Sequence, residues 1–406
     1  MLSPTQRWLR ISLFNLLLVA AIGTILRYKI VYYLPFVDQK HLMHAHSHFA
    51  FTGWITMAIM ALMVAYLAAE AGESIFKKYR WILYANLLTA YGMLLSFPFE
   101  GYGKFSISFS TLSIIANYIF AFTFWTDLDK LSKKNISHSW FKAALVFNVV
   151  SSLGTFVLAY MMANKNIHQD YYLGAVYFFL HFQYNGWFFF ACMGLLTQRI
   201  LINIVPPGRL RIIFWLFAFA CLPAFFLSAL WMPVPVWVYV IVILAAIAQV
   251  IGWTSLLYEL ITNRSYIQNN LSKAALRILK LSAIALSIKL LLQVGSTIPS
   301  LSTLAYGFRP IVIGYLHLVL LGVISLFLLG FISGYFYISI NKTTLTGLFI
   351  FIAGIILNEV LLMIQGVGDL GYNNVPYMNE SLLLTAFMLF TGILIINISQ
   401  FKKSTN

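Results

Sequence analysis

Three related runs of residues organise this chain. His48-Phe49-Ala50-Phe51-Thr52-Gly53-Trp54 recurs a third of the chain later as His181-Phe182-Gln183-Tyr184-Asn185-Gly186-Trp187. Both follow the pattern His-Phe-x-aromatic-x-Gly-Trp. A weaker third copy, which keeps the histidine and the glycine, follows after a nearly equal interval as His317-Leu318-Val319-Leu320-Leu321-Gly322. Because similarity at a fixed period marks a repeated architecture, the sequence predicts three copies, at about 1–135, 136–270 and 271–406.

The composition surrounding these runs is that of a membrane protein. Hydrophobic residues make up 61% of the 406 positions and charged residues only 9%, which excludes an ordinary soluble globular protein. Apolar runs of about 20 residues cross a bilayer as helices. Twelve such runs are predicted, with the first retained because no small-residue cleavage site follows it: 11–33, 44–68, 79–97, 106–126, 141–163, 171–196, 209–230, 234–258, 276–295, 310–337, 343–365 and 380–400.

The fold predicted is all-α: a polytopic membrane protein with twelve transmembrane helices in a single domain over residues 1–406. Each copy holds four spans, and an even number keeps the copies parallel, related by a pseudo-threefold axis along the membrane normal. Most Lys and Arg residues fall on the side of the two termini, which places both termini in the cytoplasm of, we expect, a bacterial inner membrane. The net charge of +15 is spread over short connections instead of one patch, so nucleic-acid binding is not expected.

Histidine positions indicate the chemistry. His48, His181 and His317 fall on predicted helices 2, 6 and 10, roughly 4 to 10 residues inside the outer end, in one layer. An imidazole at membrane depth is costly and by default functional, and metal ligation is a common reason. The alternative is that these side chains are hydrogen-bonded packing residues between helices. His138 and His168 lie in predicted connections and are interpreted as solvated.

Helix 2 carries additional histidines. His44 and His48 share a helix face, whereas His46 lies roughly 200° round from either of them. Two trans imidazoles bind a low-spin haem, for which His48, His181, His317 and His46 are the candidates. A copper or zinc ion needs three or four ligands, which His44, His46 and His181 begin to supply. Cys192 and Cys221 lack the C-x-x-C-H spacing, so one or two haem groups would be non-covalent, of b type, with copper as a further cofactor.

These features resemble subunit I of haem-copper oxidases and nitric oxide reductases, which have twelve helices and ligand histidines on helices 2, 6 and 10. The stretch from His44 to Trp54 is similar to the two-histidine motif of their helix 10, and also to the motif that opens helix 2 of NnrS-type haem-copper membrane proteins. The resemblance implies that His48 and His317 ligate a low-spin haem and that His181 ligates copper.

The sequence also departs from that pattern. Predicted helix 7 (209–230) has no histidine, Tyr315 stands where helix 10 would carry a second histidine, and the extra histidine is His46 on helix 2. Tyr184 follows His181 by three residues instead of four. In a second version the roles rotate by one repeat and His48 pairs with His181. Both pairings remain open.

Charged residues near the outer face have two interpretations each. Lys289 and Glu359 fall in the outer halves of their spans and form either an ion pair or part of a proton path. Arg27, Lys29 and Arg309 lie where haem propionates would point, although cations at an interface need no such reason.

The sequence therefore predicts a haem-binding membrane protein of redox character, an oxidoreductase or electron carrier that handles nitric oxide or oxygen with a cytochrome or quinol as electron donor. Oxygen reduction coupled to proton pumping is not expected, because helix 7 lacks the copper ligands. The alternative is a transition-metal transporter or metal sensor. Transporters carry broken helices, whereas the prolines around helix 7, at Pro206, Pro207, Pro233 and Pro235, lie at span ends and predict no break.

Overall fold

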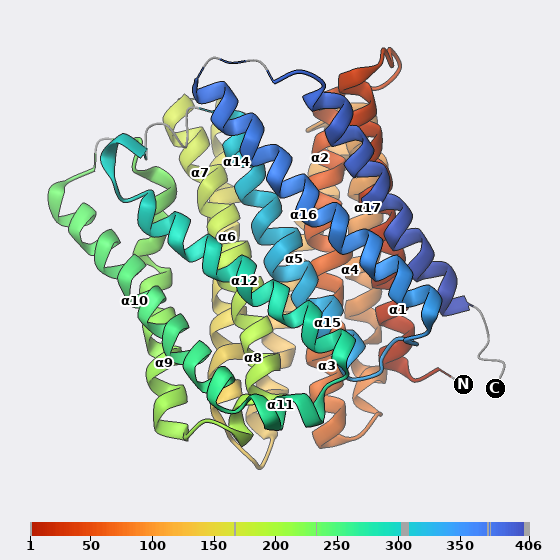
Figure 1. The fold of residues 1–406 in the computed structure, drawn as a ribbon, viewed down its shortest axis with the longest axis vertical. Coiled ribbons are helices and arrows are strands. Elements are labelled where there is room, and N and C mark those ends of the chain that lie inside the picture. The colour runs from red at the N-terminus through yellow and green to blue at the C-terminus, as the bar shows by residue number, and fades with distance from the viewer. Residues whose placement is uncertain are drawn as a thin grey trace. The chain divides into compact units, whose positions relative to one another are not determined.

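A computed structural model describes residues 2–165, 168–232, 234–301, 308–371, 373 and 375–401, and these are helical throughout apart from their connections (Figure 1). Pro233 lies outside the described residues. Two compact units make up the chain: the first unit is Met1–Phe124 with Leu328–Asn406, and the second unit is Trp125–Phe327.

Nine described helices are long and apolar enough to cross a membrane, or ten when one bent pair counts as a span. They are Pro4–Val31 (α1), Gln39–Ala71 (α2 Gln39–Phe49, η1 Ala50–Thr56, α3 Met57–Ala71), Ile75–Glu100 (α4), Lys104–Lys130 (α5), Ile136–Ala163 (α6), Val236–Thr262 (α10), Arg309–Gly334 (α14 Arg309–His317, η5 Leu318–Ser325, α15 Leu326–Gly334), Lys342–Leu370 (α16) and Met378–Gln400 within α17 (Met378–Phe401). The chain is thus an integral membrane protein by the length and composition of its helices, with bilayer lipid as its surroundings.

Two other predicted spans are helical, but they are not among the helices that are long and apolar enough to cross a membrane. The range 171–196 falls on α7 (Gln169–His181), η2 (Phe182–Phe188) and α8 (Phe189–Arg199), and 276–295 falls on α12 (Lys273–Gly295). Short helices η3 (Leu201–Asn203) and α11 (Arg264–Asn270) lie in connections.

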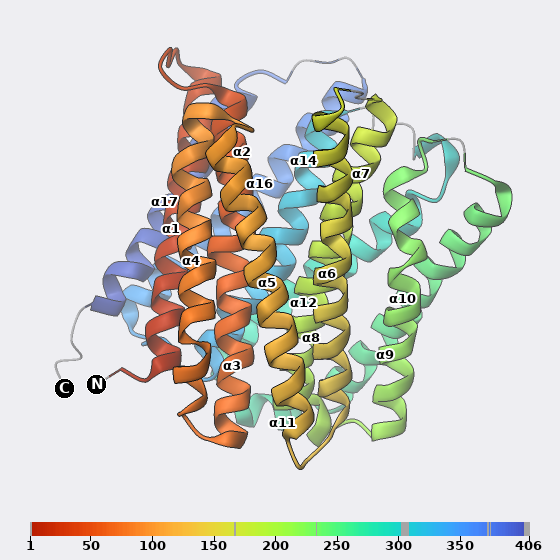
Figure 2. The same ribbon diagram turned by 180° about the vertical axis from the view of Figure 1, so that it is seen from behind.

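Within each unit, most helices pack against helices adjacent in the sequence, and a few pack against helices distant in the sequence. In the first unit α16 lies against α17, α17 against α1, and α2 against α4 (Figures 1 and 2). In the second unit α6 packs against α7 and α8, α10 packs against α9 (Pro207–Cys221) and α12, and α12 packs against η5.

One prediction about helix 7 is wrong. The range 209–230 is not one straight helix but α9 (Pro207–Cys221) followed by the 3-10 helix η4 (Pro223–Ala229), with a bend of 43° between them. Pro223 is the physical reason, since it has no N–H to donate and its ring collides with the carbonyl of the preceding turn. Prolines at span ends had suggested an unbroken helix, while this proline lies inside the span.

A second feature absent from the sequence prediction is a change of helix type after each repeated histidine. Three π-helical segments occur in the described chain, and they begin one or two residues after His48 (η1), His181 (η2) and His317 (η5). π turns are rare, occur mostly as single turns within α-helices, and are frequent at functional sites. Every repeated run is therefore marked structurally as well as by its residues.

Side chains from neighbouring helices bond the backbone of these π segments. Asn15 Nδ2 on α1 donates to the Gly53 carbonyl over 2.6 Å, and Asn86 Nδ2 on α4 donates to the Thr52 carbonyl over 3.1 Å. In the second unit Ser282 Oγ on α12 donates to the Val323 carbonyl over 2.8 Å. A π turn shifts carbonyls out of the regular i to i−4 ladder, and buried carbonyls require a partner. These polar side chains therefore stabilise the change of helix type.

The glycines of the second and third runs serve close packing of helices. A methyl group at Gly186 would lie 2.5 Å from Phe147 Cβ on α6, and one at Gly322 would lie 3.2 Å from Ala285 Cβ on α12. Both glycines therefore permit close contact between neighbouring helices.

Candidate functional site

The start of α2 positions the histidines of the first unit. Asp38 precedes α2, and its carboxylate accepts a hydrogen bond of 2.8 Å from the His41 backbone N–H, which caps the helix. The helix then carries His44 and His48 one turn apart. Both rings lie against the same two aromatic side chains, Phe97 on α4 and Tyr102 just after it.

His48 and His44 have different surroundings within this cluster. The His48 ring stacks on Phe97 with centroids 4.6 Å apart and planes 17° apart, and its Nε2 lies 3.3 Å from the Tyr102 hydroxyl. The His44 ring lies 4.6 Å from the Tyr102 ring. His44 Nε2 is buried and has no hydrogen-bond partner among the described residues. A buried imidazole nitrogen without a partner is unfavourable, so this atom marks a position where a ligand would gain binding energy.

His46 lies apart from that cluster, as its position on the helix requires. A methyl group at Gly23 on α1 would lie 3.1 Å from His46 Cε1, so the ring occupies space that this glycine leaves. Helix α2 thus presents His44 and His48 toward α4 and His46 toward α1.

His181 is buried in the second unit, with 1% of its surface exposed, and both ring nitrogens have protein partners. Nε2 lies 2.9 Å from the Cys221 backbone carbonyl, and Nδ1 lies 3.1 Å from Asn185 Nδ2. A carbonyl only accepts, so Nε2 carries the proton and Nδ1 accepts from the asparagine. Metal ligation by His181 would require one of these hydrogen bonds to break.

The broken helix supplies the Cys221 acceptor. Because α9 ends at Cys221 and the Phe225 N–H bonds the Leu222 carbonyl in the 3-10 turn, the Cys221 carbonyl does not continue the α-helical ladder. Sequence reasoning missed Cys221 and Asn185 as partners of His181. Asn185 lies four residues after His181, a spacing that places the two on one helix face and was a usable signal.

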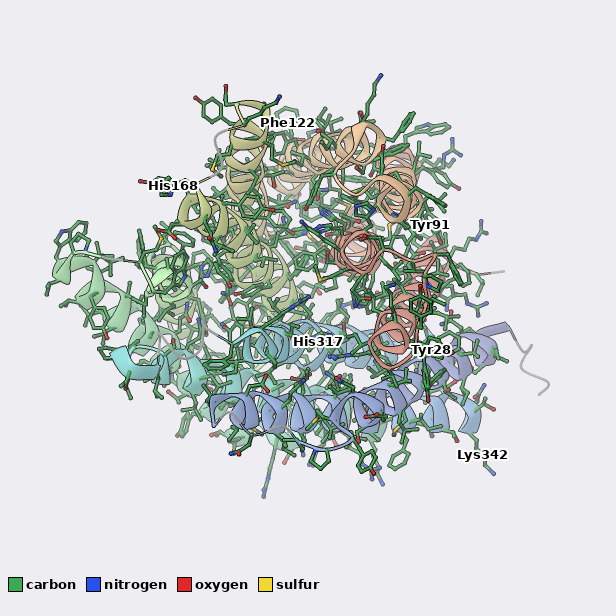
Figure 3. All side chains as sticks on the ribbon, turned by 90° about the horizontal axis from the view of Figure 1, so that it is seen from above. Tyr28, Tyr91, Phe122, His168, His317 and Lys342 are labelled. Carbon is green, nitrogen blue, oxygen red and sulfur yellow. The ribbon has the colours of Figure 1, made fainter. Side chains whose placement is uncertain are left out.

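His317 sits at the end of α14 and is half-buried (Figure 3). Its Nδ1 donates a hydrogen bond of 2.8 Å to the Ile313 backbone carbonyl. This bond fixes the tautomer in which Nε2 is unprotonated, the form that ligates a metal, and backbone carbonyls commonly orient ligating histidines in this way. Tyr315 on the same helix makes an edge contact with Tyr184 of η2, with ring centroids 6.3 Å apart.

The remaining predicted residues are placed as follows. Lys289 lies in the second unit, whereas Glu359 lies in the first unit and accepts a hydrogen bond of 3.2 Å from Asn358 Nδ2. Lys29 Nζ donates to the Leu34 carbonyl over 2.7 Å. His168 is exposed before α7 (Figure 3), but His138 is buried on α6 instead of solvated, so its interpretation as a loop residue is wrong. Helix α6 begins at Ile136, earlier than predicted, because Asn135 caps it.

Together these contacts bring His44 and His48 to one cluster and place His181 and His317 on helices joined through a tyrosine pair. In the part of the chain that the structure describes, no three His, Cys, Asp or Glu side chains form a group suited to a metal ion. Coordination of copper by His44, His46 and His181, and the pairing of haem ligands, stay predictions.

The capping carboxylate gives a pH prediction. Its hydrogen bond to the His41 N–H, with a smaller contribution from the positive charge of Lys29, lowers the pKa of Asp38 below its ordinary value. A lowered folded pKa means that the stabilising effect is complete above an ordinary carboxyl pKa of about 4 and is lost as the pH falls through the lowered value. We expect Asp38→Asn to remove this pH dependence and keep the cap, measured by thermal unfolding between pH 3 and 6. An unchanged pH profile in the variant would contradict the assignment.

Comparison with known protein families and with curated proteins found no match for this chain.

Proposed function

We propose that this chain is a haem-binding integral membrane protein of redox character, which transfers electrons or handles nitric oxide or oxygen. In this proposal twelve spans form three parallel four-helix copies around a pseudo-threefold axis, with both termini on the cytoplasmic side of a bacterial inner membrane. A cytochrome or a quinol supplies the electrons. In this proposal the chain resembles subunit I of the oxidases, but its copper site is incomplete.

The observation that carries the proposal is the coincidence of each repeated histidine with a π-helical segment. His48, His181 and His317 lie far apart in the chain, yet each is followed at once by η1, η2 or η5. In each unit a polar side chain of a neighbouring helix bonds a carbonyl of that segment. Packing alone rarely selects a costly helix type at the same place three times, and this favours a shared role in ligand binding.

The residues fit a haem group to different degrees. His317 fits best, since its donated Nδ1–H leaves Nε2 in the ligating form. His44 has a buried nitrogen that lacks a hydrogen-bond partner among the described residues, and the His48 ring is oriented by stacking on Phe97. His181 fits least, because both of its nitrogens are held by Cys221 and Asn185. His317 is therefore the haem ligand that we favour, and its pairing with His48, which the resemblance implies, stays a prediction.

Bound haem with two imidazole ligands supplies one-electron transfer, and with one open position it binds a diatomic gas. The protein's own residues would position the histidine rings. The Ile313 carbonyl would hold the His317 ring and its tautomer, and Phe97 would hold the His48 ring plane.

Colour is the direct test of this function. Protein purified in detergent from cells supplied with haem precursor is expected to show a Soret band, a sharp α band on reduction, and at least about one haem per chain in a pyridine haemochrome assay. Metal analysis of the same sample is the control. A colourless protein with one zinc or copper ion per chain would contradict the proposal.

One observation favours a second candidate, a transition-metal transporter. The helix broken at Pro223 directs the Cys221 carbonyl at His181, and broken helices commonly form the ion sites of transporters. Uptake of zinc or copper by proteoliposomes, abolished by His181→Ala, would support this candidate.

A further inference from the structure

A small cavity lies inside the second unit, where η2, α8, α9, α10 and α12 meet. It has room for about one water molecule or one monatomic ion. Phenylalanine and leucine side chains form most of its wall. The polar groups that reach it come from Asn185, Cys221, Gln249 and Lys289.

Lys289 brings an amino group to this cavity, with only 5% of its surface exposed. The second unit contains four acidic residues, and none is left for this lysine. Three are paired, as Asp127 with Lys130, Asp129 with Lys142 and Glu259 with Arg209, while Asp170 is exposed at the start of α7. Within the described ranges, Lys289 forms no ion pair with any of these carboxylates.

Gln249 adds a second unsatisfied group to the same cavity. Its side chain is 4% exposed, and the oxygen Oε1 is buried without a hydrogen-bond partner in the described structure. Turning the amide over exchanges its oxygen and nitrogen, so that the same side chain presents two N–H donors. The wall is thus suited to negative charge.

We propose that this cavity binds one small inorganic anion of the size of chloride, held by the Lys289 ammonium and the Gln249 amide. A buried ammonium is unfavourable unless it is paired, and a buried amide needs a partner. One anion satisfies both groups, and the cavity excludes polyatomic anions by size. The inference does not depend on haem binding.

Halide-dependent stability tests the site. The full chain is purified in detergent with gluconate as the anion, and bromide or chloride is titrated at constant ionic strength while tryptophan fluorescence reports thermal unfolding. We expect a saturable rise of the midpoint temperature, because an anion that binds only the folded state stabilises it. Lys289→Met is expected to abolish the rise. Lys280→Met, an exposed lysine on the same helix, is expected to retain it.

Two further measurements keep the test decisive if Lys289→Met does not fold. Gln249→Met is expected to raise the half-saturating bromide concentration about threefold to tenfold, the effect of one hydrogen bond. Bromide-soaked crystals are expected to give an anomalous peak between Lys289 Nζ and Gln249. A midpoint independent of halide, or an unchanged response in Gln249→Met, would overturn the site and indicate a neutral lysine beside water. A colourless protein would contradict the haem proposal alone.

Discussion

His317→Ala is expected to lose at least about 90% of its bound haem, because removal of an axial ligand costs more than the 10–100-fold loss typical of a ligand's supporting partner. The His317 side chain is oriented by the Ile313 carbonyl, so its nitrogen Nε2 is the protein atom best prepared for iron. The measurement is haem per chain by pyridine haemochrome, together with the reduced α band.

Matched variants separate ligand loss from misfolding. His168→Ala removes an exposed imidazole near α7 and is expected to keep full haem. His317→Gly should regain its spectrum when imidazole is added, since the small ligand occupies the space of the missing ring. His48→Ala should lose haem in parallel with His317→Ala if these two residues form the pair. Full haem content with an unchanged spectrum in His317→Ala would contradict the assignment.

Arg209→Met is expected to destabilise the protein by about 1–3 kcal/mol, the cost of leaving a buried polar or charged group without its partner. Arg209 at the start of α9 pairs with Glu259 near the end of α10, and the glutamate is only 5% exposed. Arg209 itself is half exposed, so water relieves part of the loss and keeps the effect below that of a fully buried pair. Unfolding in denaturant at pH 7 measures the change.

Lys142→Met provides the comparison. Lys142 Nζ lies 2.6 Å from Asp129 Oδ1, but both partners are solvent-accessible, and such pairs contribute little to stability. The double variant Arg209→Met with Glu259→Met should recover most of the lost stability, because no buried charge remains. Equal effects of Arg209→Met and Lys142→Met would show that water already solvates Glu259.

Much of the candidate site could be predicted from spacing alone. The four-residue interval between His44 and His48, and the two-residue interval to His46, indicate correctly which rings share a helix face, because 3.6 residues per turn is a local property. The cluster with Phe97 and Tyr102 could not be predicted in this way. Those aromatic side chains come from α4 and its end, and their approach depends on how α2 packs against α4.

Of the two hydrogen-bond partners of His181, one could be predicted from the sequence and the other could not. Asn185 lies within the same run and was accessible to a spacing argument. The Cys221 carbonyl lies 40 residues away in the chain and is available only because the helix breaks before Pro223. A proline inside an apolar run predicts a break in the helix. It does not predict which side chain will form a hydrogen bond with the carbonyl left at the break.

By itself the amino-acid sequence determined that this chain is a helical membrane protein and that three histidines open related runs of residues. Apolar length and a repeated residue pattern are local properties, and the bilayer leaves the backbone little choice but the helix. Only the tertiary structure decided that the helix becomes a π-helix after each histidine, that the bend at Pro223 brings the Cys221 carbonyl to His181, and that Lys289 lies buried without an ion pair among the described residues. Each of these depends on side chains that distant helices bring together, such as Asn15 on the Gly53 carbonyl 38 residues away, and no local pattern encodes that meeting.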